Sequence, residues 1–465
     1  MMTLLLTVGA CAPAGQVTGP PPLSAAAWSG QAEASAPIGA PLAELLNASE
    51  LQTLITQSFN NNSDIRLARA RVAQSHALLR AARQATLPEV SLVAGANRRF
   101  EKTGSNPLDF TDAFARLDVE IELDIFGRLN AGKNAAVSRA SAAELQRDAI
   151  ILAIETDVAS AFVQRAAIAR RITILDKNID RAVELERVIR VRSAQGAATR
   201  VDQGLQTIRL LNLRDEESRM RQALDQTRTA LAILTGAEAP QFSVGAADVD
   251  SITIPQLSPA PPRELLAVRP DVRASEALIQ AANGDVRQAR AAFYPQISFS
   301  AQSMLASAAT GPLSTSLNLG SSLLAPIFSR GRLQSAFQFA TAVQLEAVER
   351  YRQTILNALA EVEDAQSARL RSAERAKLLD AIVKEARLTA HLAQVQFIEG
   401  EEDLQNVLNA ENSLSSAEDA QVVSWQESVF AQIALYRAMG GYRKRTPVFL
   451  DQSHGANNCS PSDHL

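Results

Sequence analysis

The clearest structural signal in the chain is Arg116-Leu117-Asp118-Val119-Glu120-Ile121-Glu122-Leu123-Asp124-Ile125. Successive side chains of a strand point to opposite faces, so an extended chain here has one aliphatic face and one almost wholly acidic face. A half-buried strand of a soluble sheet alternates in the same way. The run also matches the roughly 9–11 residues that a strand needs to cross a membrane. If it does so, the acidic face lines a channel with Asp118, Glu120, Glu122 and Asp124.

Three other runs also have strand character. We expect strands at about 89–99, 113–126, 296–304 and 314–328. Four strands cannot close a membrane barrel, because the smallest single-chain bacterial barrels use eight. Open sheet edges are not tolerated in lipid. Membrane-spanning strands would therefore require several chains to share one barrel, and three chains with four strands each would give twelve.

The N-terminus resembles the processing signal of a bacterial lipoprotein. Residues 1–10 are apolar and end in small residues directly before Cys11, as in a lipobox, so we expect Cys11 to be acylated. Residues 11–46 would then form an extended, lipid-anchored segment. Signal peptides usually carry a cationic head and span about 15–30 residues. Residues 1–10 contain neither Lys nor Arg, so we expect the natural start to lie upstream. The alternative is a free cysteine in an unstructured leader.

The second half of the chain repeats the first. Gly127 recurs 204 residues later as Gly331, and Gly196 recurs as Gly400. Such a unit is too long for a solenoid, whose repeats run about 20–50 residues. The chain therefore contains the same fold element twice, and we expect the function to depend on the structure that the two copies form together. The expected divisions are a first repeat over 47–236, an equatorial linker over 237–262, a second repeat over 263–440 and a tail over 441–465.

Long helices dominate both repeats. The pattern predicts one helix over 47–86 and a much longer one over 129–194, where apolar residues step by three and four as in a coiled coil. The matching long helix of the second repeat covers 333–397. At 1.5 Å per residue, about 65 residues reach roughly 100 Å, far more than one globular core needs.

Each long helix ends at a glycine, after which the chain folds back as a hairpin. Glycine just past a helix end is the usual left-handed cap. The first return helix starts with a capping box, Thr199-x-x-Asp202. The second starts with three acids, which favour the positive end of the helix dipole. The tip residues are Gly196, Thr199, Asp202, Gly400, Glu401, Glu402 and Asp403.

Composition argues against several functional classes. The chain has 46% hydrophobic and only 5% aromatic residues, a profile closer to coiled coils than to a globular enzyme. The net charge is −4 and no Lys/Arg block dominates a segment, which argues against a nucleic-acid partner. Cys11 and Cys459 form no metal-binding spacing. We find no glycine-rich phosphate loop or nucleophile elbow, so we expect no enzyme, cofactor or metal.

A longer motif in the second repeat points to a family. The run Arg269-Pro270-Asp271-Val272-Arg273-Ala274-Ser275-Glu276, continuing to Ala289-Arg290-Ala291-Ala292-Phe293-Tyr294-Pro295, resembles the signature of TolC-type outer membrane factors. Within that family the chain is most similar to the NodT-like lipoprotein branch that serves tripartite efflux systems. Pro326-Ile327-Phe328 with Gly331-Arg332 is similar to the family's second strand-to-helix junction.

The resemblance implies a fold that is mainly α with a transmembrane β-barrel. It implies a homotrimer whose twelve-stranded barrel sits in the bacterial outer membrane and whose long α-helical barrel projects through the periplasm. Small molecules would pass through this conduit passively, while an inner-membrane pump of the RND type supplies energy and a periplasmic adaptor joins the two. The alternative is a soluble periplasmic coiled-coil scaffold, or the adaptor itself.

The resemblance also implies that the two tips dock the adaptor and gate the entrance. Family members often narrow the entrance with an aspartate in a Leu-Asp-Ala-Gln context. Here the corresponding run is Leu408-Asn409-Ala410-Glu411, which would give a polar but uncharged ring. The alternative for the acids near the second tip is that they only cap a helix. The residues expected at the constriction are Gln405, Asn409 and Asn412.

Overall fold

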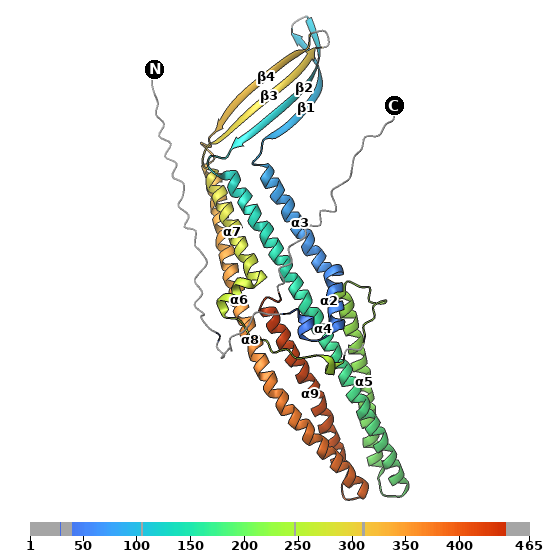
Figure 1. Cartoon of the computed structure of the whole chain (residues 1–465). Coiled ribbons are helices and arrows are strands. Elements are labelled where there is room, and N and C mark those ends of the chain that lie inside the picture. Colours follow the sequence, from blue (N-terminus) through green and yellow to red (C-terminus); the bar gives the residue numbers. More distant parts are fainter. Residues whose placement is uncertain (1–27, 29–39, 104–105, 246–247, 309–311, 443–465) are drawn as a thin grey trace.

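The computed structural model describes residues 28, 40–103, 106–245, 248–308 and 312–442. It has a long helical body with a four-stranded sheet at one end (Figure 1). The expected signal peptide, Cys11, most of segment 11–46, Cys459 and nearly all of the tail lie outside the described residues. Among the described residues, no helix combines the length and apolar character needed to cross a membrane.

The sheet joins the two halves of the chain. Its strands are β1 (Glu89–Thr103), β2 (Asn106–Leu123), β3 (Gln296–Ala308) and β4 (Ser314–Leu324). They are antiparallel in the order β1-β2-β3-β4, so β2 from the first half of the chain pairs with β3 from the second. In the described chain, β1 and β4 are the free edges of this sheet.

The strand ends differ from those expected from sequence. The pairing of β1 with β2 continues beyond the expected strand ends at 99 and 113, up to Thr103 opposite Asn106. β2 ends three residues earlier than predicted because the carboxylate of Asp124 accepts hydrogen bonds from the first turn of the next helix. β4 ends at Leu324, ahead of Pro326, which lacks the N–H that a sheet ladder needs.

Two long helices carry the body. Helix α4 (Arg128–Ala194) has 67 residues and α8 (Arg330–Glu399) has 70, so each is about 100 Å long. Near the sheet, α3 (Ser63–Gln84) lies against α4, α4 against α7 (Pro270–Ala291), and α7 against α8 (Figure 1). Toward the tips, α5 (Arg200–Thr235) packs on α4, and α9 (Leu404–Ala438) packs between α4 and α8.

The helix predicted over 47–86 is two helices, α2 (Ser49–Asn61) and α3, and the single-helix prediction was wrong. The side chain of Asn62 makes the break, because its Oδ1 accepts from the backbone N–H groups of Asp64 at 2.9 Å and Ile65 at 3.2 Å. Its Nδ2 donates to the carbonyl of Leu234 at the end of α5, 2.8 Å away. A side chain that caps one helix and ties another is a tertiary contact that helical periodicity does not report.

A hydrophobic core lies where these helices meet, midway along the body. Segment 237–262 wraps around it, with α1 (Leu42–Leu45), the 3-10 turn Val249–Ser251 and α6 (Pro262–Val268) nearby. The backbone N–H of Thr253 donates to the carbonyl of Leu46, and that of Leu257 donates to Gln432 of α9. The fully buried members of the core are Leu42, Leu46, Leu51, Ile65, Val158, Ala159, Val163, Ala166, Leu231, Val429 and Tyr436.

Candidate functional site

The sheet has two chemically opposite faces that run across all four strands. Directly opposed residues of antiparallel strands share a face. One row reads Ser91, Asp118, Gln302 and Asn318, and its neighbour reads Val90, Val119, Ala301 and Leu319. Leu92 and Leu319 on the apolar face are 73% and 76% exposed, although few soluble sheets leave such a face uncovered. The apolar face therefore requires lipid or another apolar partner.

The polar face is less acidic than the sequence predicted. Asp118 accepts from Arg116 at 2.8 Å and from Gln302 at 2.9 Å. Glu122 forms an ion pair with Arg128 of α4, at 2.5 Å. Glu120 forms no ion pair with a described residue and lies between Glu89 and Ser300. Asp124 has left the strand and caps α4. Of the four predicted acids, Glu120 therefore contributes the clearest unbalanced charge to this face.

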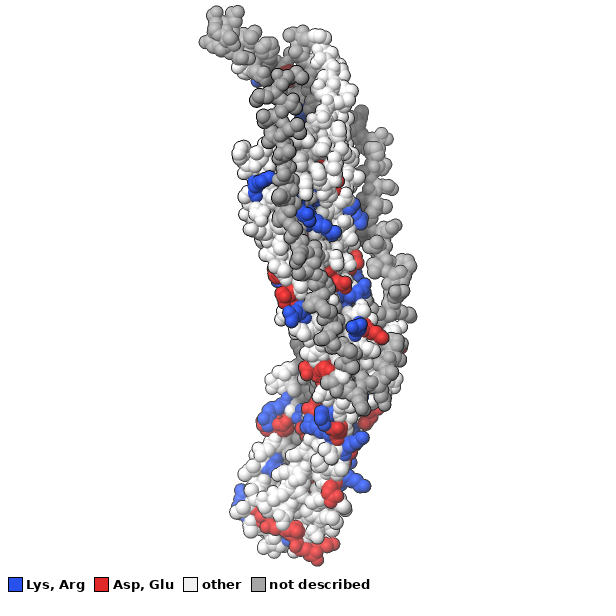
Figure 2. Space-filling model, turned by 90° about the vertical axis from the view of Figure 1, so that its left-hand side faces the viewer, with Lys and Arg blue, Asp and Glu red and all other residues white. Residues whose placement is uncertain are grey.

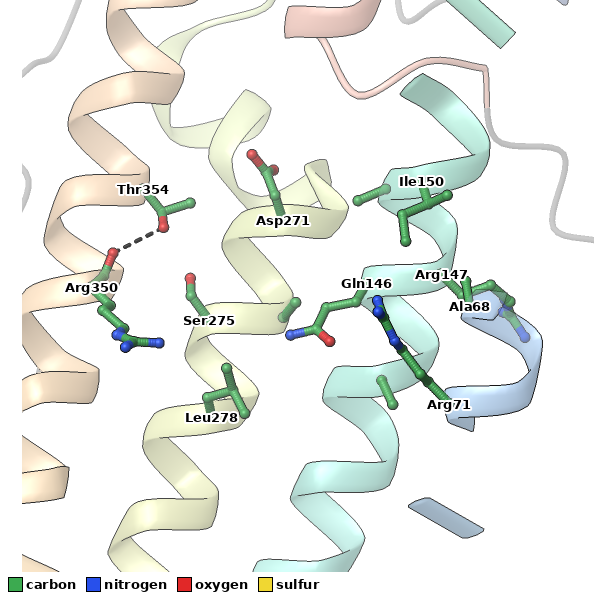
Figure 3. A pocket seen from close by; sticks show the side chains of 13 residues that line it. Ala68, Arg71, Gln146, Arg147, Ile150, Asp271, Ser275, Leu278, Arg350 and Thr354 are labelled. Carbon is green, nitrogen blue, oxygen red and sulfur yellow. Dashed lines mark hydrogen bonds between the residues drawn. The ribbon is translucent and has the colours of Figure 1, made fainter. Parts of the chain in front are cut away.

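The polar face continues onto the helices. Gln146 follows Arg128 by eighteen residues, or five full turns of 3.6, so both lie on the same side of α4. Gln146 lines a cavity of about 430 Å³ between α3, α4, α7 and α8. Figure 3 shows Arg71, Arg147 and Arg350 around it, on three of these helices. This wall therefore adds basic groups to the acids and amides of the sheet.

At the first tip, the backbone has the expected geometry. Gly196 has φ 75°, in the left-handed region that favours glycine. The side chain of Thr199 accepts from the N–H of Asp202, whose carboxylate accepts from the N–H of Thr199 at 2.7 Å. This is the reciprocal capping box that the sequence predicted. It starts α5 directly after the turn and fixes the hairpin.

At the second tip, Gly400 has φ 86° and ends α8. Asp403 caps α9, since its side chain accepts from the N–H of Gln405 at 3.2 Å. The hydrogen bond donated by Asn406 lowers the pKa of Glu402, with a smaller effect from the N–H of Asp403. Glu401 is exposed. In Figure 2, acidic side chains gather at this end of the body, away from the sheet. The acids thus cap the helix and also present negative charge.

The three residues expected at a constriction share one exposed side of α9. Gln405, Asn409 and Asn412 are spaced by four and three residues, and the amide of Gln405 donates to Asn409 at 3.4 Å. Other sides of α9 bury Leu404, Leu408 and Glu411. The structure brings the three amides together as one polar strip.

A buried ionic cluster between the hairpins was missed by the sequence analysis. Glu411 of α9 is 5% exposed, and its carboxylate lies 3.3 Å from Arg181 of α4 and 3.4 Å from Arg209 of α5. Two turns further along α9, Glu418 is 2.9 Å from Arg387 of α8. Burial lowers the pKa of Arg209 despite the nearby carboxylate. The only local signal was two acids seven residues apart on a side of α9 that is otherwise apolar.

Comparison with known proteins gives a single answer. The family model described as outer membrane efflux protein matches residues 54–237 and 262–441. A pyoverdine export outer membrane protein, OpmQ of Pseudomonas putida, is 32% identical over 406 residues, covering 84% of this chain and 86% of the relative. OprJ of Pseudomonas aeruginosa is 27% identical, with 95% of each chain covered.

Solved structures agree on the fold. The outer-membrane channel OprN superposes with a TM-score of 0.85 at 24% identity, over 92% of this chain and 98% of that one. CusC superposes with a TM-score of 0.80 at 22% identity, over 91% and 99%. The alternative of a soluble scaffold or adaptor finds no support in these matches. The chain belongs to the outer membrane efflux protein family, and it is the outer membrane channel component of an efflux system rather than an enzyme.

Proposed function

We propose that three copies of the chain assemble side by side into one conduit, with a twelve-stranded barrel in the outer membrane and a long helical barrel below it. The observation that carries this proposal is the sheet itself. It has an exposed apolar face, a polar face and two free edges, β1 and β4. Pairing β1 of one copy with β4 of the next satisfies every edge, which lipid requires.

The polar side of each subunit would line the channel. Arg128 joins the polar face of the sheet to the same side of α4, so one wall runs from the strands to the helices. With the apolar face in lipid, this wall faces inward and carries acids, amides and arginines. A wide, water-filled passage of mixed charge favours passive conduction of unlike small molecules. Relatives named for pyoverdine export and toluene efflux support low selectivity in the channel.

The two hairpin tips would dock a periplasmic adaptor, which joins the channel to an inner-membrane pump of the RND type. Both turns are fixed by capped helices and present an open glycine, Gly196 or Gly400, and the second turn adds exposed acids. Gln405, Asn409 and Asn412 would narrow the entrance. We also propose that Cys11 is acylated and anchors each chain to the membrane.

Disulfide formation between edge strands tests the assembly. Leu92→Cys on β1 is combined in turn with Leu317→Cys, Leu319→Cys or Leu323→Cys on β4, and membranes are oxidised. In at least one combination we expect covalent products of two and three chains and none longer, while Leu92→Cys alone gives neither. A series that continues past three chains, or monomers in every combination, would refute the proposal.

A further inference from the structure

A second cavity lies at the junction between the sheet and the helices. It has a volume of about 370 Å³ and opens between α4 and α7. The rings of Phe126 and Tyr294 stack at its margin, with centroids 4.8 Å apart and planes 12° from parallel. Arg287 and Arg290 of α7 and the amides Asn130 and Asn134 of α4 complete the lining. Cationic and amide donors beside an aromatic pair suit an anionic group with an apolar neighbour.

This junction cavity opens on the outer side of the subunit. Asn130 follows Arg128 by two residues, about 200° around the helix, so it lies away from the polar wall. Ile125 and Phe126, directly beyond β2, are 60% and 45% exposed. The cavity therefore lies at the foot of the apolar face of the sheet, where a bilayer's hydrocarbon would give way to headgroups.

The cavity lies at the middle of the subunit. It follows the seam between α4 and α7, whereas the outer helices of the layer near the sheet are α3 and α8. A neighbouring copy that pairs through β1 and β4 would contact the margins and leave this seam open. The cavity thus stays accessible to lipid in the proposed trimer.

The cations at this cavity lack protein counterions. Neither Arg287 nor Arg290 forms an ion pair with any described residue. Asp124, which caps α4 at this junction, already accepts three hydrogen bonds, from the N–H groups of Leu129 and Asn130 and from the Asn130 amide, at 2.7–2.9 Å. Lys133 adds a further positive charge nearby, as its amine donates to Asn130 at 2.7 Å. Both arginines are exposed, so their charges are accessible to an external anion.

We propose that this cavity binds the phosphate of a glycerophospholipid from the periplasmic leaflet, with the acyl chains on the apolar face of the sheet. The guanidinium groups of Arg287 and Arg290 would hold the phosphate, and the Phe126–Tyr294 pair would contact the glycerol end of the chains. Tyrosine and other aromatic residues are enriched at this depth of membrane proteins. This inference rests on the proposed membrane-spanning role of the sheet.

Lipid retention by the purified assembly tests the site. Wild type, Arg287→Gln/Arg290→Gln and Arg287→Lys/Arg290→Lys are titrated with dioleoylphosphatidylglycerol in detergent, and bound lipid per chain is counted by native mass spectrometry. The matched control is Arg273→Gln, fourteen residues before Arg287 on α7 and so about 21 Å away along the axis. We expect the double glutamine variant to bind the lipid roughly tenfold or more weakly, because charge-assisted bonds are lost. The lysine variant and the control should keep most of the affinity.

Two ligand arms identify the source of the anion. Dioleoylglycerol, which lacks the phosphate, should bind weakly and without regard to the arginines, and inorganic phosphate should compete poorly. Equal affinity of phosphatidylglycerol for the double glutamine variant and for wild type would overturn the proposed site. Tight binding of inorganic phosphate would show that the site takes free phosphate and not a lipid. If the double variant does not assemble, Arg290→Gln alone is used. The same spectra report the number of chains, so loss of the trimer is seen separately from loss of lipid.

Discussion

The buried carboxylate of Glu411 on α9 lies 3.3 Å from the partly exposed guanidinium of Arg181 on α4, an ion pair that joins the two hairpins near the tips. Arg209 approaches the same carboxylate from α5 at 3.4 Å. Glu411→Gln would leave the largely buried Arg209 and the partly exposed Arg181 facing a neutral amide, and breaking a fully buried pair from one side costs about 3–5 kcal/mol. We expect the free energy of unfolding to fall by an amount near the low end of this range, because Arg181 also contacts Glu418 at 3.7 Å. Guanidinium unfolding followed by helical circular dichroism measures it.

The matched control for Glu411 is Glu427→Gln, which removes the partner of Arg375 between α8 and α9 on the surface. Exposed pairs are worth about 0–1 kcal/mol, so its stability should barely change. Equal losses in the two variants would mean that the Glu411 cluster is not desolvated in the assembly.

Membrane exposure of the sheet is tested by Val119→Arg. Val119 lies on the apolar face, and an arginine facing lipid near the bilayer midplane costs about 2–4 kcal/mol. We expect less assembled channel in the outer membrane fraction. Glu120→Arg, one residue along on the polar face, should assemble almost normally. If Val119→Arg assembles as well as Glu120→Arg, that face does not contact lipid.

Local patterns in the sequence predicted the elements of the fold well. The alternation of Leu117 through Ile125 predicted that β2 has one apolar and one polar face. The capping motif at Thr199 and Asp202 is present as expected. Gly196 and Gly400 both have the left-handed backbone that ends a helix. These features are set by neighbours within a few residues, so a single sequence contains the information.

Features that depend on distant residues could not be predicted in this way. Asn62 breaks a helical pattern because Leu234, 172 residues away, offers it a carbonyl. Arg209 meets Glu411 across 202 residues. The neutralisation of Glu122 by Arg128 also escaped prediction, because it depends on how the strand turns into α4. Side-chain pairing between elements is a tertiary property.

The tips are tested by Gly196→Val and Gly400→Val. A Cβ would meet nothing within 4 Å at either site, so the substitution acts only by forcing a branched residue into a left-handed backbone. That conformation costs roughly 1–2 kcal/mol. We expect weaker adaptor cross-linking and greater drug sensitivity. Gly204→Val, at an equally open position within α5, is the control and should leave both readouts close to wild type. Unchanged efflux in the variant that carries both tip substitutions would show that the tips take no part in docking the adaptor.

The charge of the polar face predicts a weak cation preference. Glu120 lacks an ion-pair partner among the described residues and lies opposite Glu89. Glu120→Gln should lower the cation-to-anion permeability ratio of the reconstituted channel, since three unbalanced charges would leave a trimeric pore. The double change Glu122→Gln/Arg128→Gln should change it less, because it removes a balanced ion pair. The ratio is read from the reversal potential in a salt gradient, and an anion-selective wild type would contradict the expectation.

A largely buried carboxyl group beside the hydrophobic core midway along the body predicts how the stability of the protein changes with pH. Glu155 accepts from the hydroxyl of fully buried Tyr436 at 3.1 Å, and burial raises the pKa of Glu155 above its usual value. The folded state therefore binds this proton more tightly than the unfolded state, so the stabilisation is complete below the unfolded pKa and is lost as pH rises through the folded pKa.

Glu155→Gln keeps an oxygen acceptor and does not titrate. We expect it to be more stable than wild type at pH 7 and to lose that advantage near pH 4, in guanidinium midpoints measured across this range. Asp157→Asn, two residues along α4 with a half-exposed side chain, should show no such trend. An advantage for Glu155→Gln that grows toward acidic pH would show that the carboxylate is stabilised in its charged form.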